Sequence, residues 1–257
     1  MGYLMKTWKI VILSSMLTSG AALATGGYGG HGGPGVTIDH APHISGKAPL
    51  IPQSGTWDEA VHVYQTGNGN TSGVSQNHAS LSTVDVHQTG NFGSSSVTQT
   101  ATNSVVILDQ KGFGNQSTAN QSGSSSSIKV LQNGNGNKSD ATQTAGGSKN
   151  AIFVDQNGTG NSSWAKQSGS NNSINVKQTG DYAVSEISQA GYKSIVDVSQ
   201  SGTLNKSYVT QSANNSAVLV EQGGSYNTST VNQTHANAVS WVQQGPGSGN
   251  TSYISQQ

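Results

Sequence analysis

The chain has 257 residues, of which 9% are charged and 32% hydrophobic, and its 11 basic side chains balance its 11 acidic ones. It contains no cysteine and no arginine, which excludes a disulfide-stapled secreted domain and argues against a nucleic-acid binder that depends on arginine. Low hydrophobicity without net charge is not the composition of an expanded disordered chain. A polar, uncharged chain rich in Asn and Gln is instead typical of stacked β-structure.

Residues 1–24 have the layout of a secretory signal peptide. Lys6 and Lys9 form the positive region, Ile10–Leu17 the apolar region, and Ala22–Ala24 the small-residue cleavage site. The apolar run is too short to cross a bilayer. We therefore expect cleavage after residue 24, secretion, and no stable membrane span in the mature chain.

Residues 25–57 form a leader rich in glycine and proline, without apolar periodicity, and we expect it to be flexible and to serve export or targeting. His31, His40 and His43, together with Asp39, could chelate a metal weakly. An unstructured tail that happens to contain histidines explains them better. We expect neither a metal site nor a cofactor.

Residues 58–257 repeat one unit of about 22 residues nine times. In the first eight units two glutamines lie 11 residues apart, as Gln110 and Gln121 do, and a ninth, looser unit runs from Gln244 to Gln256. Such a fixed period decides the architecture before any other argument.

Each unit predicts two strands. Val106 and Leu108 precede Gln110 at intervals of two, and comparable apolar pairs precede the first Gln of other units. Ser117 and Ala119 lead to Gln121 with the same alternation. Apolar residues at period two, ending on an in-phase Gln, indicate strands with one buried face.

A tight turn is expected between the two strands. Glycine adopts positive φ and asparagine tolerates it, so both are typical turn residues. The turn glycines are Gly67, Gly90, Gly112, Gly134, Gly158, Gly180, Gly202 and Gly224.

One unit cannot bury its inner face alone, so the units must stack. We predict an all-β fold, a parallel two-sheet β-solenoid of cross-β type, about 40 Å long at the spacing of parallel strands. Stacking places Gln on Gln and Asn on Asn, and such amide ladders satisfy buried amides along the stack. The predicted ladder and self-assembly residues are Gln65, Gln76, Gln88, Gln99, Gln110, Asn115, Gln121, Gln132, Asn137, Gln143, Gln156, Asn161, Gln167, Gln178, Gln189, Gln200, Asn205, Gln211, Gln222, Asn227, Gln233, Gln244, Asn250 and Gln256.

The spacing Ser104-x5-Gln110-x-Gly112-x-Gly114-Asn115-x-Ser117-x3-Gln121 resembles the repeats of the curlin family, the subunits of curli amyloid fibres. The resemblance covers about residues 59–257 and is greatest to the major curlin subunit. The family's Ala is Ser in all nine units, which makes the inner face more polar. Nine units also exceed the five familiar in curlins, and the opening Ser is replaced in four units by Glu59, Asn150, Asn172 and Ala238.

The resemblance implies a secreted structural subunit that forms a homopolymer, an extracellular fibre resembling a pilus or fimbria. Such fibres serve cell adhesion, surface colonisation and biofilm matrix. It also implies a nucleator subunit and an outer-membrane curli export apparatus as partners, with no nucleic acid required. We expect coils 1 and 9 to present unpaired strand edges to which further subunits add.

Two alternatives stay open. The chain could be the minor nucleator subunit, although its last unit lacks the charges expected there. It could instead be a monomeric secreted solenoid that binds glycans as an adhesin through Trp164, Tyr208 and Tyr253. An enzyme is not expected, because histidines and carboxylates are scattered without the convergence that a catalytic site needs.

Overall fold

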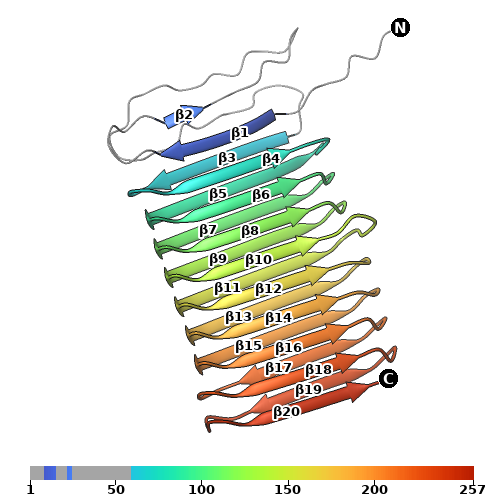
Figure 1. The fold of residues 1–257 in the computed structure, drawn as a ribbon. Helices are drawn as coiled ribbons and strands as arrows, with labels where there is room; N and C mark the ends of the chain where they lie inside the picture. Colours follow the sequence, from blue (N-terminus) through green and yellow to red (C-terminus); the bar gives the residue numbers. More distant parts are fainter. Residues whose placement is uncertain (1–8, 16–21, 25–58) are drawn as a thin grey trace, which may run out of the picture.

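The computed structural model describes residues 9–15, 22–24 and 59–257 (Figure 1). The predicted leader, residues 25–57, lies outside this part, and so does most of the predicted signal peptide. Residues 59–257 form two facing sheets of parallel strands wound into nine coils, which confirms the predicted β-solenoid. No helix suited to crossing a bilayer occurs in the described ranges.

The first sheet contains the opening strand of every unit. Its strands are β3 (Glu59–Thr66), β5 (Ser82–Asn91), β7 (Val105–Phe113), β9 (Ser127–Asn135), β11 (Ala151–Thr159), β13 (Ser173–Asp181), β15 (Ile195–Thr203), β17 (Ala217–Gln222) and β19 (Val239–Gln244).

The second sheet contains the closing strand of every unit. These strands are β4 (Thr71–Gln76), β6 (Ser94–Gln99), β8 (Gln116–Gln121), β10 (Lys138–Gln143), β12 (Ser162–Gln167), β14 (Val184–Gln189), β16 (Lys206–Gln211), β18 (Thr228–Gln233) and β20 (Thr251–Gln256).

Each residue pairs with its own counterpart in the next coil. Gln110 pairs with Gln132 in the first sheet, and Ser117 pairs with Ser139 in the second. The register survives the two longer units, because the insertions at 77–79 and 144–149 lie in connections outside the strands. The sequence period is therefore also the period of the structure.

The core is a narrow apolar strip between the two sheets. Leu108 and Val130 of the first sheet are fully buried, and so are Ala119 and Ala141 of the second. In these coils large side chains on one sheet thus face small ones on the other, whereas most other coils have Val or Ile on both sheets. Columns of buried Gln and Ser flank this strip.

Six of the eight turn glycines lie inside the opening strand, whereas Gly67 and Gly224 follow it. Strand β9 continues through Gly134, whose φ of 118° suits no L-residue well. A Cβ on Gly134 would lie 2.1 Å from the carbonyl oxygen of Gly158 in the next coil. This column must be glycine for two reasons, backbone angle and close approach of the coils.

The residue two positions later is different. Gly136 has a φ of 62°, and a Cβ added there would meet nothing within 4 Å. Its counterparts Phe92, Tyr182 and Leu204 adopt the same left-handed backbone with φ of 56–58°. A side chain is therefore tolerated at this position.

The N-terminal end of the solenoid differs from expectation. β1 (Lys9–Ser15) pairs antiparallel with β4, and β2 (Ala22–Ala24) pairs with β1. Both strands belong to the predicted signal peptide. In the full chain the outer edge of β4 is covered, whereas β3 ends its sheet within the described part of the chain.

The two glycine positions generate a matched test. We expect Gly134→Ala to lower the urea midpoint strongly, equivalent to about 3 kcal/mol, since strained φ and a backbone clash add together. Gly136→Ala should cost about 1 kcal/mol, the ordinary penalty of a left-handed residue. Urea titration followed by circular dichroism measures both. Equal shifts would contradict the close approach at Gly134.

Candidate functional site

Two ladders of buried glutamine side chains run the length of the solenoid. In each, Nε2 of one coil donates a hydrogen bond to Oε1 of the next coil. The eight bonds of the first-sheet ladder, from Gln65 to Gln244, are 2.5–2.9 Å long. The eight bonds of the second-sheet ladder, from Gln76 to Gln256, are 2.6–3.1 Å long.

Both ladders have a direction. The Nε2 of Gln156 also donates to the carbonyl oxygen of Lys138 at 2.9 Å, and that of Gln178 to Ser162 at 3.0 Å. A carbonyl oxygen can only accept a hydrogen bond, so the atom of the side-chain amide that faces it must be Nε2. All the ladder donors point towards the C-terminal coil, and all the ladder acceptors point towards the N-terminal one.

The asparagine column bonds differently from the expected amide ladder. Asn137 Nδ2 donates to the carbonyl oxygen of Gly158 at 2.9 Å, and Asn137 Oδ1 accepts the backbone N–H of Asn161 at 3.0 Å. Each Asn of this kind therefore joins the backbones of two coils beside the turn. A side-chain bond between two asparagines of this column occurs at its end, where Asn250 Nδ2 donates to Asn227 Oδ1 at 3.0 Å.

The opposite corner uses the opening serines in the same way. Ser126 Oγ accepts the backbone N–H of Asn150 at 3.2 Å, and Asn150 Nδ2 donates to the carbonyl oxygen of Gly169 at 2.7 Å. Asn150 and Asn172 depart from the repeat pattern, yet both still bond the next coil. In the sequence this position is part of the repeat pattern, but the pattern alone predicts no role for it. The sequence feature that could have indicated this role is that most units have Ser or Asn at this position.

The ladders are incomplete at the C-terminal coil. Gln244 is 8% exposed, Gln256 is half-buried and Asn250 is exposed. Gln244 Nε2 donates to Thr228 O at 3.0 Å, and Gln256 Nε2 donates to Val239 O at 3.3 Å. One amide hydrogen of each is left to face the position of a tenth coil.

The backbone edge at the C-terminal coil is also open. Thr228 N donates to Asn250 O at 2.8 Å, and Thr234 N donates to Gln256 O at 2.8 Å. Alternate N–H groups of a parallel strand point to the same neighbour, so those of Thr251, Tyr253 and Ser255 point away from β18. Within the described residues β20 and β19 end their sheets.

The N-terminal coil presents hydrogen-bond acceptors that complement the donors of the C-terminal coil. Gln65 and Gln76 start the ladders as donors, so their Oε1 atoms face outwards along the stack. In the full chain β1 lies beside Gln76, whereas Gln65 belongs to β3, which ends its sheet within the described residues. One end of the solenoid thus presents donors and the other presents acceptors.

The aromatic residues considered for glycan binding lie in one outward column of the second sheet. Trp164 and Tyr208 are separated by Glu186, and Tyr253 follows after Thr230. The first two line a shallow depression of about 460 Å³ together with Asp140 and Lys166. The aromatic rings are therefore two coils apart rather than side by side.

Outward charges are few and widely spaced. Lys111 Nζ lies 3.2 Å from Asp109 Oδ2, and Asp155 stands in register with Lys177. Burial raises the pKa of Asp197; the Asn175 hydrogen bond opposes this shift, and the nearby Glu221 charge adds to it.

The serines on the inner face of the second sheet are imperfectly satisfied. The hydroxyls of Ser139, Ser163 and Ser185 are buried and have no hydrogen-bond partner among the described residues. These are positions at which the curlin pattern has alanine. The hydroxyl adds nothing to the stack there and loses its water.

Comparison with known proteins gives one match. The curlin associated repeat matches residues 147–180 and 195–224, which cover less than half of the chain. No curated protein matches the chain. The two matched segments contain whole coils, β11 with β12 and β15 with β16, so they coincide with the repeat of the structure. The match supports a relation to curlins for the repeat region.

The two kinds of buried serine generate the second test. Ser163→Ala should raise the free energy of unfolding by about 1 kcal/mol, because it removes a buried hydroxyl without a partner. Ser126→Ala should lower it by a similar amount, since Ser126 Oγ accepts from Asn150 and donates to Ser124 O at 2.9 Å. Urea titration of both variants decides. If Ser163→Ala lowered the free energy of unfolding as much as Ser126→Ala does, the Ser163 hydroxyl would have a hydrogen-bond partner.

Proposed function

We propose that the chain is a secreted, non-enzymatic structural subunit that assembles end to end into extracellular curli-like amyloid fibres. Such fibres would serve adhesion, surface colonisation and biofilm matrix. The match to the curlin associated repeat and the stacked fold both support this function.

The observation that carries the proposal is the complementarity of the two ends. Gln244 and Gln256 offer amide donors at one end, and Gln65 and Gln76 offer acceptors at the other. An interface between two different surfaces of the same chain does not close on itself without rotation, so it propagates as a filament. Head-to-tail addition would extend both ladders without reversing any amide.

A junction of this kind would repeat a step that the chain already makes internally. The last internal step pairs six residues of β18 with β20 and six of β17 with β19. It also adds one Gln–Gln bond to each ladder. Natural proteins usually blunt such edges with charge or proline, and the strands β19 and β20 contain neither.

The N-terminal edge supports a link between secretion and assembly. In the full chain β1 occupies the outer edge of β4. Cleavage after residue 24 would remove β1 and β2 together, and the second sheet would then be open at both ends. The proposed precursor is thus blocked at one end of one sheet until export.

Within the curlin-like class we favour the major subunit over the nucleator. Residues 244–257 contain no charged side chain, and β20 pairs with β18 in unbroken register. A regular, uncharged last coil suits a subunit that joins the fibre and then receives the next subunit. A nucleator and an outer-membrane export apparatus remain proposed partners by the resemblance.

The first test is assembly itself. Residues 25–257, diluted from denaturant, should form fibres that bind thioflavin and give a β-rich circular dichroism spectrum, because open edges with matching ladders leave nothing to stop growth. Fluorescence and electron microscopy measure this. A dye-negative monomer that persists for days at high concentration would overturn the proposal.

The second test blocks the C-terminal edge. Ser255→Pro and Gln243→Pro remove N–H groups that face away from the neighbouring coil, and proline is tolerated on edge strands. Together they should slow seeded elongation roughly ten-fold or more, as each lost edge bond is worth about 1 kcal/mol. Ser255→Ala with Gln243→Ala is the matched control and should elongate normally. Equal rates for the two pairs would show that β19 and β20 are not the growing edge.

A further inference from the structure

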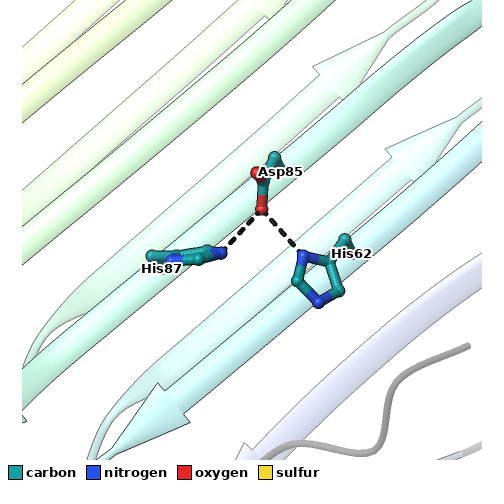
Figure 2. Close-up of side chains that lie close together, drawn as sticks. All are labelled: His62, Asp85 and His87. Carbon is teal, nitrogen blue, oxygen red and sulfur yellow. Dashed lines mark hydrogen bonds and ion pairs between the residues drawn. The ribbon is translucent and has the colours of Figure 1, made fainter.

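Three polar side chains converge on the outward face of the first sheet, at its N-terminal end. They are His62 of β3 and Asp85 and His87 of β5 (Figure 2). The fibre-forming function does not use them, because they point away from the ladders. In the described part of the chain they form the one group of three His, Cys, Asp or Glu side chains whose ligand atoms lie within 4.8 Å of one another.

The register of the coils produces this convergence. His62 stands directly opposite Asp85, and His87 follows Asp85 by two residues on the same face. Neighbouring strands are about 4.8 Å apart and alternate residues about 7 Å apart. Side chains of this length can therefore meet above the sheet.

The atoms that meet are possible metal ligands. His62 Nδ1 lies 3.0 Å and His87 Nε2 lies 3.1 Å from the same oxygen, Asp85 Oδ1. The centroids of the two imidazole rings are 5.4 Å apart and the ring planes are inclined at 67°. The side chains are 35–45% exposed, so an ion can reach them without unfolding.

His87 gives a second, independent indication. Its Nε2 is buried and makes no hydrogen bond of acceptable geometry in the described part of the chain, although it lies at ion-pair distance from Asp85. The nitrogen is thus directed at the centre of the group without being satisfied by it. A metal ion there would satisfy this nitrogen.

We propose that His62, Asp85 and His87 bind a divalent transition-metal ion of the zinc class, through His62 Nδ1, Asp85 Oδ1 and His87 Nε2. Tetrahedral ligands at 2.0–2.1 Å from zinc are about 3.3 Å from each other, so small side-chain rotations complete the site. Two imidazoles and one carboxylate select zinc, copper or nickel over calcium and magnesium, which prefer oxygen. Water occupies the remaining position.

The surroundings favour a cation. Asp109 stands in register with His87 on the next strand, and its Oδ1 is buried without a hydrogen-bond partner in the described part of the chain. Its other oxygen is 3.2 Å from Lys111 Nζ. The outward residues differ from coil to coil. The repeat pattern therefore does not by itself bring His62, Asp85 and His87 together.

The site would strengthen the first coil. β3 ends its sheet, so it lacks one of the two neighbours that interior strands have. A metal that binds β3 and β5 together stabilises the folded coil in proportion to the logarithm of metal concentration over Kd. The N-terminal edge at which a subunit would dock is then held in register.

The test is titration of the unassembled, full-length chain with ZnCl2 at neutral pH. We expect one zinc ion to bind, and His62→Gln or His87→Gln to weaken binding at least roughly ten-fold. The matched control replaces His31, His40 and His43 with Gln, which removes the leader histidines, and should leave binding unchanged. Circular dichroism checks that each variant folds.

Hydrogen exchange supplies a readout other than affinity. Zinc should slow exchange of the β3 amides in the unaltered chain but not in His87→Gln. Zinc binding that is lost in the leader variant and kept in His62→Gln would overturn the proposal in favour of the leader. Absence of any binding would show that the group is a hydrogen-bonded cluster only. Neither result depends on fibre formation, so the site and the proposed function are tested separately.

Discussion

The structure depends on one constraint, that every residue must tolerate its own counterpart about 4.8 Å away in the next coil. Inside the solenoid, glutamine meets this constraint because its amide is both donor and acceptor. The glycine column meets it because the next coil's carbonyl occupies the place of a Cβ, as at Gly134. A charged residue repeated down such a column would meet its own charge in the next coil. The buried positions of the described residues accordingly contain no charged side chain.

The constraint also explains how a polar interior is stable. Glutamine bonds the next coil in every interior unit and asparagine does so in most of them, whereas Ser139, Ser163 and Ser185 leave buried hydroxyls without partners among the described residues. An unsatisfied hydroxyl costs about 1–3 kcal/mol. The amides and the apolar strip of Val, Ile and Leu must offset that cost. Stability therefore accumulates per coil, as expected for a solenoid whose units contact mainly their neighbours.

Much of this fold could be predicted, because a period of two within strands and about 22 between them fixes both the inward face and the stacking partner. The burial of Gln110, Asn115 and Gln121 follows from that pattern. The backbone bonds of asparagine could not be predicted, since they depend on how closely the turn approaches the next coil. The grouping of His62, Asp85 and His87 could not be predicted from the sequence for another reason. It lies across two units, and the outward positions of a repeat carry no recurring signal. The pairing of β1 with β4 involves a segment outside the repeats, which has no periodic pattern to place it.

The proposed polymer raises the question of what distinguishes a step within the chain from a step between chains. The hydrogen bonds and buried surface would be the same in kind, since coil 9 ends in the edge that every earlier coil presents to its successor. The difference is the connecting loop, which holds successive coils at a high effective concentration. A step between chains lacks that loop, so it depends on protein concentration. Control of assembly must then lie outside the repeat, in whatever covers or frees the end coils. The strand β1 on the edge of β4 occupies such a place in the full chain. If the proposed signal peptide is cleaved, the removal of β1 with it would tie the start of growth to export.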